Sequence, residues 1–221
     1  PPIDRRSFLA SAAAGSLAAA IADANASLAA QASNASPNDR VSLAFLGLGG
    51  RGSNLLTDFL ARNDIEAPLL CDPDPNQNPE LSELVESRTG KKPRRVTDYR
   101  TVLDDKSIDA VVIATPDHWH SPLTVAACQA GKDVYVEKPL SHNDWEGAKA
   151  VEAARKYDRI VQVGTQNRSA PYNFAAVDYL RSGKLGRVPF VRVCNLKPGR
   201  PFLTKPDGAP PSGADYDLWL G

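Results

Sequence analysis

Beyond residue 40, short apolar runs alternate with amphipathic stretches of helical length. Each run is apolar enough to be covered on both faces, as the strands of a parallel sheet are. The runs cover residues 41–46, 67–71, 108–114, 133–136 and 160–163. The stretches between and after them are predicted to be helices over residues 53–61, 79–87, 121–130, 144–157 and 172–182. Gly131 and Gly183 stand where two of these helices would end. Alternating strands and helices form βαβ units, so the pattern predicts an α/β fold with a doubly wound parallel sheet.

The first 32 residues have a different pattern and are predicted to lie outside this fold. Arg5 and Arg6 precede a short alanine-rich apolar stretch that Asp23 ends. A charged start followed by such a stretch is typical of an export signal, and this one resembles a twin-arginine signal. The stretch is too short and too weakly apolar to span a bilayer, so no membrane anchor is expected. We therefore expect a leader over residues 1–32, a linker over residues 33–40, and export through the twin-arginine machinery to the periplasm or the exterior.

Composition excludes several classes of protein. Hydrophobic residues make up 42% and charged residues 24% of the 221 residues, which is typical of a globular chain. Lys and Arg number 26 and so do Asp and Glu, so the net charge is zero and nothing favours binding to nucleic acid. Cys71, Cys128 and Cys194 form no C-x-x-C pair, which argues against a zinc knuckle and a disulfide framework. We expect all three to be reduced thiols in the core.

The strongest motif is the loop Gly47-Leu48-Gly49-Gly50-Arg51-Gly52, a G-x-G-x-x-G sequence between the first strand and the first helix. Glycines suit this position because the turn is tight, the backbone approaches a pyrophosphate, and the helix packs close to the strand. Asp72 ends the second strand 20 residues after Gly52, where a carboxylate can accept hydrogen bonds from ribose hydroxyls. Together they predict a dinucleotide site on a Rossmann-type sheet. A carboxylate repels a 2′-phosphate, so NAD is favoured over NADP, a preference that a nearby arginine would weaken.

Two histidines follow the strand over residues 108–114, within Thr115-Pro116-Asp117-His118-Trp119-His120. Ligands of open α/β sheets bind at the carboxyl ends of the strands, so polar groups here are expected to face the site. His118 and His120 are two residues apart and share no helical face, which argues against a metal. Asp117 is expected to cap a helix, and the two imidazoles are expected to contact substrate or cofactor.

The next strand is followed by Glu137-Lys138-Pro139, which sets an acid beside a base. Hydride transfer forms or consumes an alkoxide, and a lysine in a dry cleft can stabilise that charge and relay its proton. A surface ion pair is the simpler interpretation of a lone Glu-Lys pair. The proline is compatible with a cis peptide bond.

Together with Val163-Gly164-Thr165-Gln166-Asn167-Arg168, these motifs resemble the glucose-fructose oxidoreductase, inositol dehydrogenase and MocA family over residues 41–221. The resemblance implies that Gly47, Gly49 and Gly52 hold the pyrophosphate and Asp72 the ribose. It places Lys138 at the nicotinamide and the substrate hydroxyl, and Gln166 and Arg168 in the same crevice. The expected catalytic residues are therefore Lys138, His120 and His118. The expected cofactor-binding residues are Gly47, Gly49, Gly50, Arg51, Gly52, Asp72, Thr115, Pro116, Glu137 and Gln166. His120 matches a recurring family histidine, Asp117 replaces the usual asparagine, and His118 belongs to an H-W-H subset.

The resemblance also divides the folded part into a dinucleotide-binding domain over residues 41–166 and the start of an α+β domain over residues 167–221. Residues 188–195 alternate like the opening strand of an antiparallel sheet, and the proline-rich residues 197–211 follow. Family members continue into a sheet domain that covers the cofactor and supplies further active-site groups. We therefore expect this sequence to be truncated and inactive by itself, and the full-length protein to be able to form a homo-oligomer.

Three functions remain open. The first is an NAD-dependent oxidoreductase acting on a sugar, polyol or sugar derivative. The second is a hydrolase or lyase that uses NAD transiently on glycosides, although members with that activity usually depart from E-K-P. The third is a nucleotide-binding sensor without catalysis. Free NAD is scarce outside the cytosol and the twin-arginine machinery moves folded proteins, so we expect the cofactor to be tightly bound and recycled.

Overall fold

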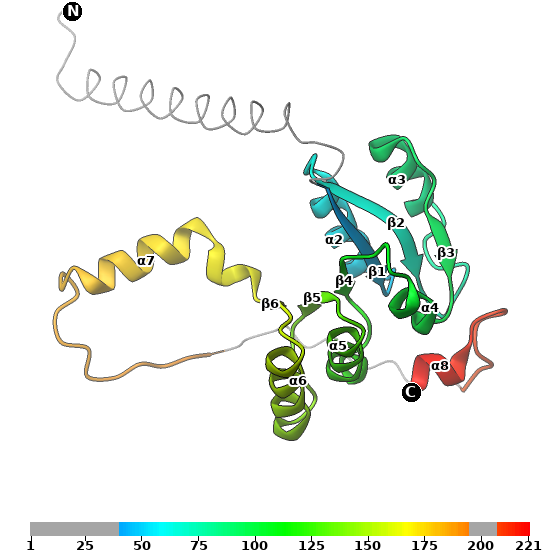
Figure 1. The fold of residues 1–221 in the computed structure, drawn as a ribbon. Coiled ribbons are helices and arrows are strands. Elements are labelled where there is room, and N and C mark those ends of the chain that lie inside the picture. Colours follow the sequence, from blue (N-terminus) through cyan, green and yellow to red (C-terminus); the bar gives the residue numbers. More distant parts are fainter. Residues whose placement is uncertain (1–39, 195–206) are drawn as a thin grey trace, which may run out of the picture.

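The computed structural model describes residues 40–194 and 207–221. Its centre is a six-stranded parallel sheet (Figure 1). The strands are β1 (Val41–Leu46), β2 (Ile65–Cys71), β3 (Arg94–Val96), β4 (Ala110–Ile113), β5 (Asp133–Glu137) and β6 (Val161–Gly164). They lie in the order β3-β2-β1-β4-β5-β6. The chain extends the sheet one way through β2 and β3 and then returns to place β4 against β1. The order therefore reverses between β1 and β4, where open α/β sheets bind their ligands.

Helices cover both faces of the sheet (Figure 1). The helices of the described residues are α2 (Gly50–Leu60), α3 (Leu81–Thr89), α4 (Tyr99–Asp104), α5 (His120–Gln129), α6 (Asp144–Lys156), α7 (Pro171–Arg181) and α8 (Tyr216–Leu220), with short 3-10 helices η2 (Asp117–Trp119) and η3 (Gln166–Ser169). Of these, α7 buries no residue and extends away from the sheet (Figure 1). Side chains alternate along β1, so Leu43 and Phe45 pack with α2 and α3, whereas Ala44 and Leu46 pack with α4, α5 and α6. The doubly wound α/β fold is confirmed.

The five expected strands and five expected helices all form, with ends displaced by up to three residues. Gly131 and Gly183 follow α5 and α7 with positive φ of 79° and 72°, as helix-ending glycines do. The pattern missed β3, α4 and α8 because these elements span only three, six and five residues. Elements this short carry too few apolar positions to show a period.

The strand expected over residues 188–195 is wrong for the part that the structure describes. Residues 188–194 have no regular structure, and Val188, Phe190, Val191 and Val193 are exposed. No described strand lies beside them, and an extended segment without a partner leaves its backbone hydrogen bonds unmade. Residues 195–206, which hold the first part of the expected proline-rich segment, lie outside the described residues, as do the expected leader and most of the linker.

Cys71 and Cys128 are buried as expected, whereas Cys194 is exposed and the expectation of a core thiol is wrong there. Cys194 lies within the segment expected to form a strand, and that segment has no regular structure in its described part. Within residues 40–194 and 207–221, no helix is both long enough and apolar enough to cross a membrane.

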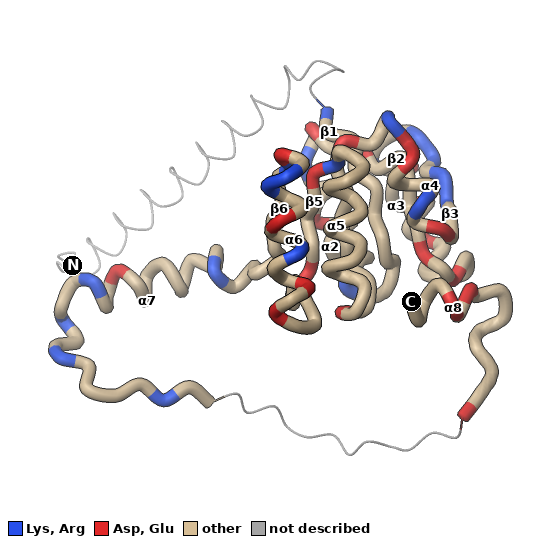
Figure 2. The backbone as a smooth tube through the Cα atoms, turned by 60° about the horizontal axis from the view of Figure 1, so that its bottom comes forward, with Lys and Arg blue, Asp and Glu red and all other residues tan. Residues whose placement is uncertain are grey.

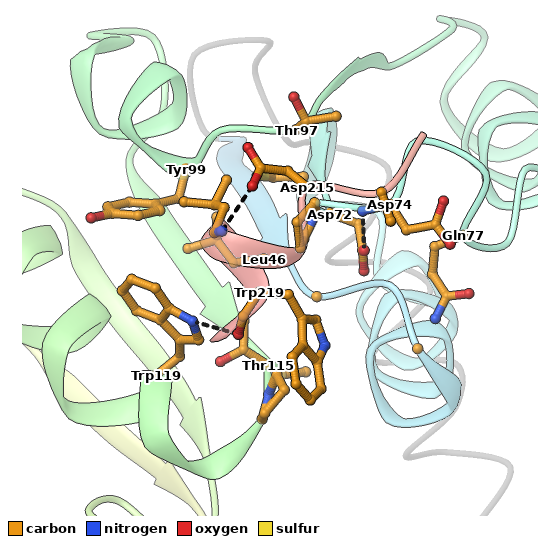
Figure 3. Close-up of a pocket in the computed structure, with 18 of the residues that line it drawn as sticks. Leu46, Asp72, Asp74, Gln77, Thr97, Tyr99, Thr115, Trp119, Asp215 and Trp219 are labelled. Carbon is orange, nitrogen blue, oxygen red and sulfur yellow. Dashed lines mark hydrogen bonds between the residues drawn. The ribbon is translucent and has the colours of Figure 1, made fainter. Parts of the chain in front are cut away.

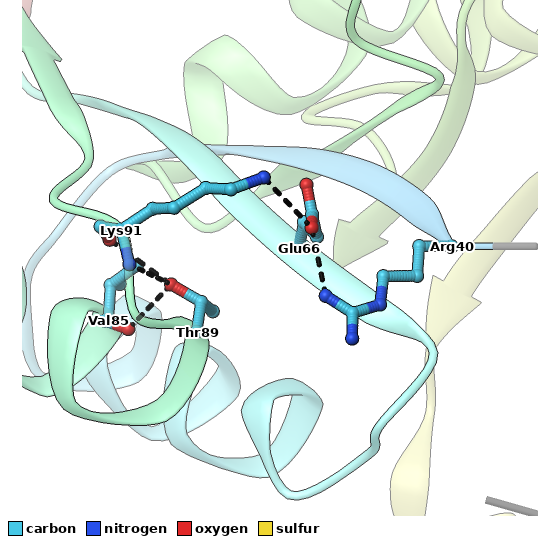
Figure 4. Close-up of polar contacts among 5 residues, drawn as sticks. All are labelled: Arg40, Glu66, Val85, Thr89 and Lys91. Atoms are coloured by element: carbon cyan, nitrogen blue, oxygen red, sulfur yellow. Dashed lines mark hydrogen bonds and ion pairs between the residues drawn. The ribbon is translucent and has the colours of Figure 1, made fainter. Parts of the chain in front are cut away.

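Charged side chains of both signs are interspersed along the described backbone (Figure 2). At the amino end of the sheet, Glu66 accepts hydrogen bonds from Arg40 at 3.0 Å and from Lys91 at 3.4 Å (Figure 4). The hydrogen bond from Arg40 is the main cause that lowers the pKa of the Glu66 carboxyl. Such partly exposed pairs contribute only about 0–1 kcal/mol to stability. The ion pairs around Glu66 therefore contribute little to stability, and the charges that would act on a ligand are those of the groups that line its site.

Candidate functional site

Backbone contacts at Gly47 and Gly52 of the glycine-rich loop leave no room for a side chain. Gly47 has a φ of +88°, and a Cβ there would lie 2.6 Å from the carbonyl oxygen of Ala114 after β4. A Cβ on Gly52 would lie 1.9 Å from the carbonyl oxygen of Gly47. Gly50 has no such neighbour within 4 Å. The loop thus packs tightly against β4 and the start of α2, while its outer side stays open for a ligand.

Asp72 joins this loop to the end of β2. One carboxylate oxygen accepts from the backbone N–H of Leu48 at 2.8 Å, and the other accepts from the N–H of Asp74 at 3.0 Å. Burial raises the pKa of the Asp72 carboxyl, and these two backbone hydrogen bonds oppose that rise. Each carboxylate oxygen keeps a further lone pair for a ligand hydroxyl.

A cavity of about 630 Å³ lies over the carboxyl ends of β1, β2 and β4 (Figure 3). Its walls include the glycine loop, residues 72–74 after β2, Thr97 and Tyr99 after β3, and Thr115, Pro116 and Trp119 after β4. Residues between 211 and 219 form the remaining wall. The cavity holds most of the residues expected to bind a cofactor, at the position where the strand order reverses.

Thr115 lines this cavity and carries a buried side-chain hydroxyl. Its Oγ1 is buried and has no hydrogen-bond partner among the described residues. A buried hydroxyl without a partner is costly unless a ligand or water completes it. The open outer side of the glycine loop and the Asp72 carboxylate fit a dinucleotide with its pyrophosphate and ribose groups, and a ligand that displaces the neighbours of the Thr115 hydroxyl could give it a partner.

The Thr115→Val substitution tests this interpretation of the hydroxyl. The unliganded protein is expected to keep or slightly raise its Tm, because valine removes a buried polar atom that makes no hydrogen bond. Affinity for NADH is expected to fall about 3- to 10-fold, the effect of one lost hydrogen bond. Thermal denaturation and NADH titration measure the two effects. The matched control is Thr124→Val on α5, which removes a hydrogen bond of 2.7 Å to the His120 carbonyl and should lower stability by about 1 kcal/mol. Unchanged affinity in Thr115→Val would contradict the assignment.

Arg95 and two further acids decide which dinucleotide suits the cavity. The Arg95 guanidinium donates to the carbonyl oxygens of Gln77 at 2.5 Å and Asn78 at 3.2 Å, so backbone groups already bind it. Asp74 and Asp215 line the same cavity as Asp72. Carboxylates near the ribose disfavour a 2′-phosphate, so the local charge favours NAD over NADP.

The Asp72→Asn substitution is expected to weaken NAD binding about 10- to 100-fold, because the amide nitrogen cannot accept the hydrogen bonds that a carboxylate oxygen accepts. In the unmodified protein, NAD affinity is expected to fall as the pH is lowered through the raised pKa of Asp72, since protonation removes the acceptor charge. Titration of NAD against pH measures both effects, and Asp72→Asn should lose the dependence. The matched control is Asp109→Asn. This residue's carboxylate accepts a hydrogen bond of 2.8 Å from the Ser42 N–H at the amino ends of the strands, opposite the cavity. Equal NAD affinity in the two variants would contradict the role of Asp72.

Glu137 connects three parts of the candidate site. Its side chain is 4% exposed, and Oε1 accepts from Arg51 Nε at 2.7 Å and from Gln166 Nε2 at 2.5 Å. Its Oε2 accepts from the backbone N–H of Lys138 at 3.2 Å. The acid therefore pairs with Arg51 of the glycine loop, and within the described residues its side chain forms no ion pair with Lys138. Arg51 and Gln166 position Glu137, which in turn holds the Lys138 backbone.

The three expected catalytic residues lie in different surroundings. Lys138 is exposed at the carboxyl end of β5, where its peptide bond with Pro139 is cis. His118 is half-buried, and its Nε2 lies 3.1 Å from the Trp219 carbonyl oxygen. His120 is 1% exposed, and its Nδ1 and Nε2 lie 2.6 Å and 3.0 Å from the carbonyl oxygens of Pro139 and Thr115. His120 therefore ties the segment after β4 to the segment after β5, which favours a positioning role over the substrate contact expected from the sequence.

Two smaller expectations concern the segments beside these residues. Asp117 begins η2, and α5 starts at His120 without a side-chain cap, so the expected capping role of Asp117 is wrong. Gln166 and Arg168 lie on η3 and are exposed, with Gln166 directed to Glu137.

Residues 41–165 match the model of an oxidoreductase family with an NAD-binding Rossmann fold, the Gfo/Idh/MocA family. The chain belongs to the Gfo/Idh/MocA family. The matched part is more than half of the chain and carries the glycine loop, Asp72 and Lys138. NAD is therefore the cofactor of the site. In the described residues no group of three or more His, Cys, Asp or Glu side chains is placed to hold a metal ion.

Curated relatives within the Gfo/Idh/MocA family include two kinds of protein. A levoglucosan dehydrogenase of Pseudarthrobacter phenanthrenivorans is 33% identical over 111 residues, which cover 50% of this chain and 28% of that protein. A glycosyl hydrolase family 109 protein of Shewanella sp. (strain MR-4) is 27% identical over 205 residues, covering 84% of this chain and 44% of the relative. The chain thus spans less than half the length of these relatives.

Solved structures share the fold. The WlbA dehydrogenase from Bordetella pertussis, in complex with NADH and UDP-GlcNAcA, is 25% identical with a TM-score of 0.58, covering 69% of this chain and 43% of that one. Myo-inositol 2-dehydrogenase from Lactobacillus plantarum is 24% identical with a TM-score of 0.59, covering 67% and 43%. At this identity the second likeness concerns the fold alone.

Proposed function

We propose that the full-length protein is an NAD-dependent oxidoreductase that acts on a sugar, polyol or sugar derivative. The observation that carries this proposal is the placement of Lys138, exposed at the carboxyl end of the strand next to β4, at the same end of the sheet as the cavity that fits a dinucleotide. The levoglucosan dehydrogenase and the sugar-nucleotide complex of WlbA support the substrate class.

In this function, the cofactor held by the glycine loop and Asp72 would take up a hydride as NAD⁺ or supply one as NADH. In reduction, the Lys138 ammonium group stabilises the negative charge that develops on the substrate oxygen and donates a proton to it. In oxidation, the neutral Lys138 amine accepts the proton of the substrate hydroxyl. Glu137 accepts a hydrogen bond from the Lys138 backbone N–H and is itself held by Arg51 and Gln166. His120 contacts the carbonyl oxygen of the neighbouring Pro139. These contacts position the lysine without touching the reacting atoms.

A second candidate is an NAD-dependent glycoside hydrolase, which oxidises a sugar hydroxyl to allow cleavage and then reduces it again. The glycosyl hydrolase family 109 relatives, which cover most of this chain, favour it. The intact Glu137-Lys138-Pro139 sequence weighs against it, because the resemblance gives this motif to the oxidoreductases.

We propose further that the leader exports the protein and that NAD travels with it, bound and recycled. Absorbance at 260 nm of the extract from purified full-length protein measures retained nucleotide. Turnover of free sugars and of glycosides, each with and without added NAD, then separates the two enzymatic candidates. Turnover of free sugars supports the oxidoreductase, turnover of glycosides without added NAD supports the hydrolase, and an extract free of nucleotide overturns the proposal of retained cofactor.

A further inference from the structure

Residues 211–221, here called the C-terminal strap, form one wall of the cavity. They lie far from the glycine loop in the sequence. Pro211, Ala214, Asp215, Tyr216, Leu218 and Trp219 of this segment line the same cavity as Gly49 and Asp72. Figure 3 shows α8 crossing the cavity, with Trp219 close to Thr115. A ligand in the cavity therefore lies between the glycine loop and the strap.

One end of the strap is attached beside the ribose-binding acid. The backbone N–H of Asp215 donates to the carbonyl oxygen of Pro73 at 2.9 Å, directly after Asp72. The Asn76 amide donates to the carbonyl oxygen of Ser212 at 3.4 Å. These contacts fix the strap to the segment that follows β2.

The other end is attached to the segment that follows β4. The Trp119 indole N–H donates to the Trp219 carbonyl oxygen at 3.1 Å, and His118 Nε2 lies 3.1 Å from the same oxygen. A carbonyl can only accept, so His118 carries its proton on Nε2 in this contact. The His118 and Trp219 rings also meet edge to face, with centroids 5.9 Å apart and an interplanar angle of 73°. Aromatic contacts thus reinforce this attachment.

The strand order shows that the two attachments lie on opposite sides of the glycine loop. β2 and β4 are the neighbours of β1 on its two sides, and the glycine loop follows β1. A segment bound both after β2 and after β4 must pass across the loop between them. Both attachments consist of a few hydrogen bonds and ring contacts, each of modest strength, so the strap can separate from the sheet without unfolding it.

From this bridge we propose that the C-terminal strap holds the bound dinucleotide in place and slows its release. Trp119 is the positioning residue that fastens the strap, through its indole N–H. The proposal rests on the NAD site and explains how the retained cofactor of the proposed function stays bound. It assigns His118 to the strap as well, in place of the substrate contact expected from the sequence.

The Trp119→Phe substitution tests the proposal in the full-length protein, because phenylalanine keeps an aromatic ring and removes the N–H donor. The rate of NADH release is measured by displacement with excess NAD in stopped-flow fluorescence. We expect release to become about 3- to 10-fold faster, the effect of one hydrogen bond. The matched control is Trp145→Phe on α6, whose ring is 69% exposed outside the cavity lining and contacts Lys149 at 5.8 Å. Its release rate should stay unchanged.

Hydrogen exchange of the strap provides a second measurement. It can be interpreted even if the variant loses stability, because it also compares the unmodified protein with and without NADH. In the unmodified protein, the Asp215 amide is expected to exchange more slowly when NADH is bound, and Trp119→Phe should reduce this protection. An unchanged release rate in Trp119→Phe, or strap amides that do not respond to NADH, would overturn the proposal. Failure of NADH to bind would overturn the cofactor site and this proposal together. Neither measurement needs a sugar, so an absence of sugar turnover would count against the proposed function alone.

Discussion

Replacing Lys138 with alanine is expected to lower kcat of the full-length enzyme about 10²- to 10⁴-fold, the usual contribution of one acid-base group. The side chain is exposed at the carboxyl end of β5, so it is free to reach a substrate oxygen. Binding of NAD should stay unchanged, since Lys138 does not line the cavity. Steady-state kinetics and NADH titration measure the two effects.

Two further variants sharpen the test of Lys138. Lys138→Arg keeps the positive charge but cannot release a proton near neutral pH, so it should remain slow if proton transfer matters. Lys149→Ala on α6 is the matched control, because the contacts of this lysine are with Glu152 and Trp145 on the exposed face of its helix. Full turnover in Lys138→Ala would contradict the role of Lys138 and place the acid-base group elsewhere.

Gly52→Ala is expected to abolish detectable NAD binding and to lower the stability of the fold. The added Cβ would lie 1.9 Å from the Gly47 carbonyl oxygen, a backbone atom that cannot turn aside as a side chain would. The loop must then move away from α2, and overpacking of this kind costs about 1–3 kcal/mol. NADH titration and thermal denaturation give the two readouts.

Gly50→Ala is the control for the stability effect, because a Cβ there has no neighbour within 4 Å and Gly50 is the first residue of α2. It should leave the Tm unchanged or raise it slightly, since alanine is the better helix former. If Gly52→Ala bound NAD as tightly as the unmodified protein, the tight loop would not be a requirement of the site.

Features that depend on local sequence could be predicted. The glycine loop and Asp72 are set by a strand, a turn and a helix close together in the chain, so their positions follow from spacing. The surroundings of His120 could not be predicted, because both carbonyl groups that its ring contacts come from the folded arrangement of two segments. The same holds for Glu137, whose partner Arg51 is 86 residues away.

The C-terminal strap shows the limit most plainly. Trp119 and the carbonyl group that it binds are 100 residues apart, and α8 spans only five residues. No periodicity reveals so short a helix, and nothing in its sequence indicates that it lies against the dinucleotide cavity. Sequence therefore identified the floor of the cavity, whereas the structure was needed to find its cover.

The burial of two thiols bears on how the folded domain responds to oxidants. Burial raises the pKa of the Cys71 thiol to about 12, and burial likewise raises the pKa of Cys128. Reaction with oxidants and alkylating agents proceeds through the thiolate, and a thiol with a pKa near 12 is ionised in only about one molecule in 10,000 at pH 8. We therefore expect the two buried thiols to react slowly with oxidants and alkylating agents, and chemical modification of the described cysteines to begin at the exposed Cys194.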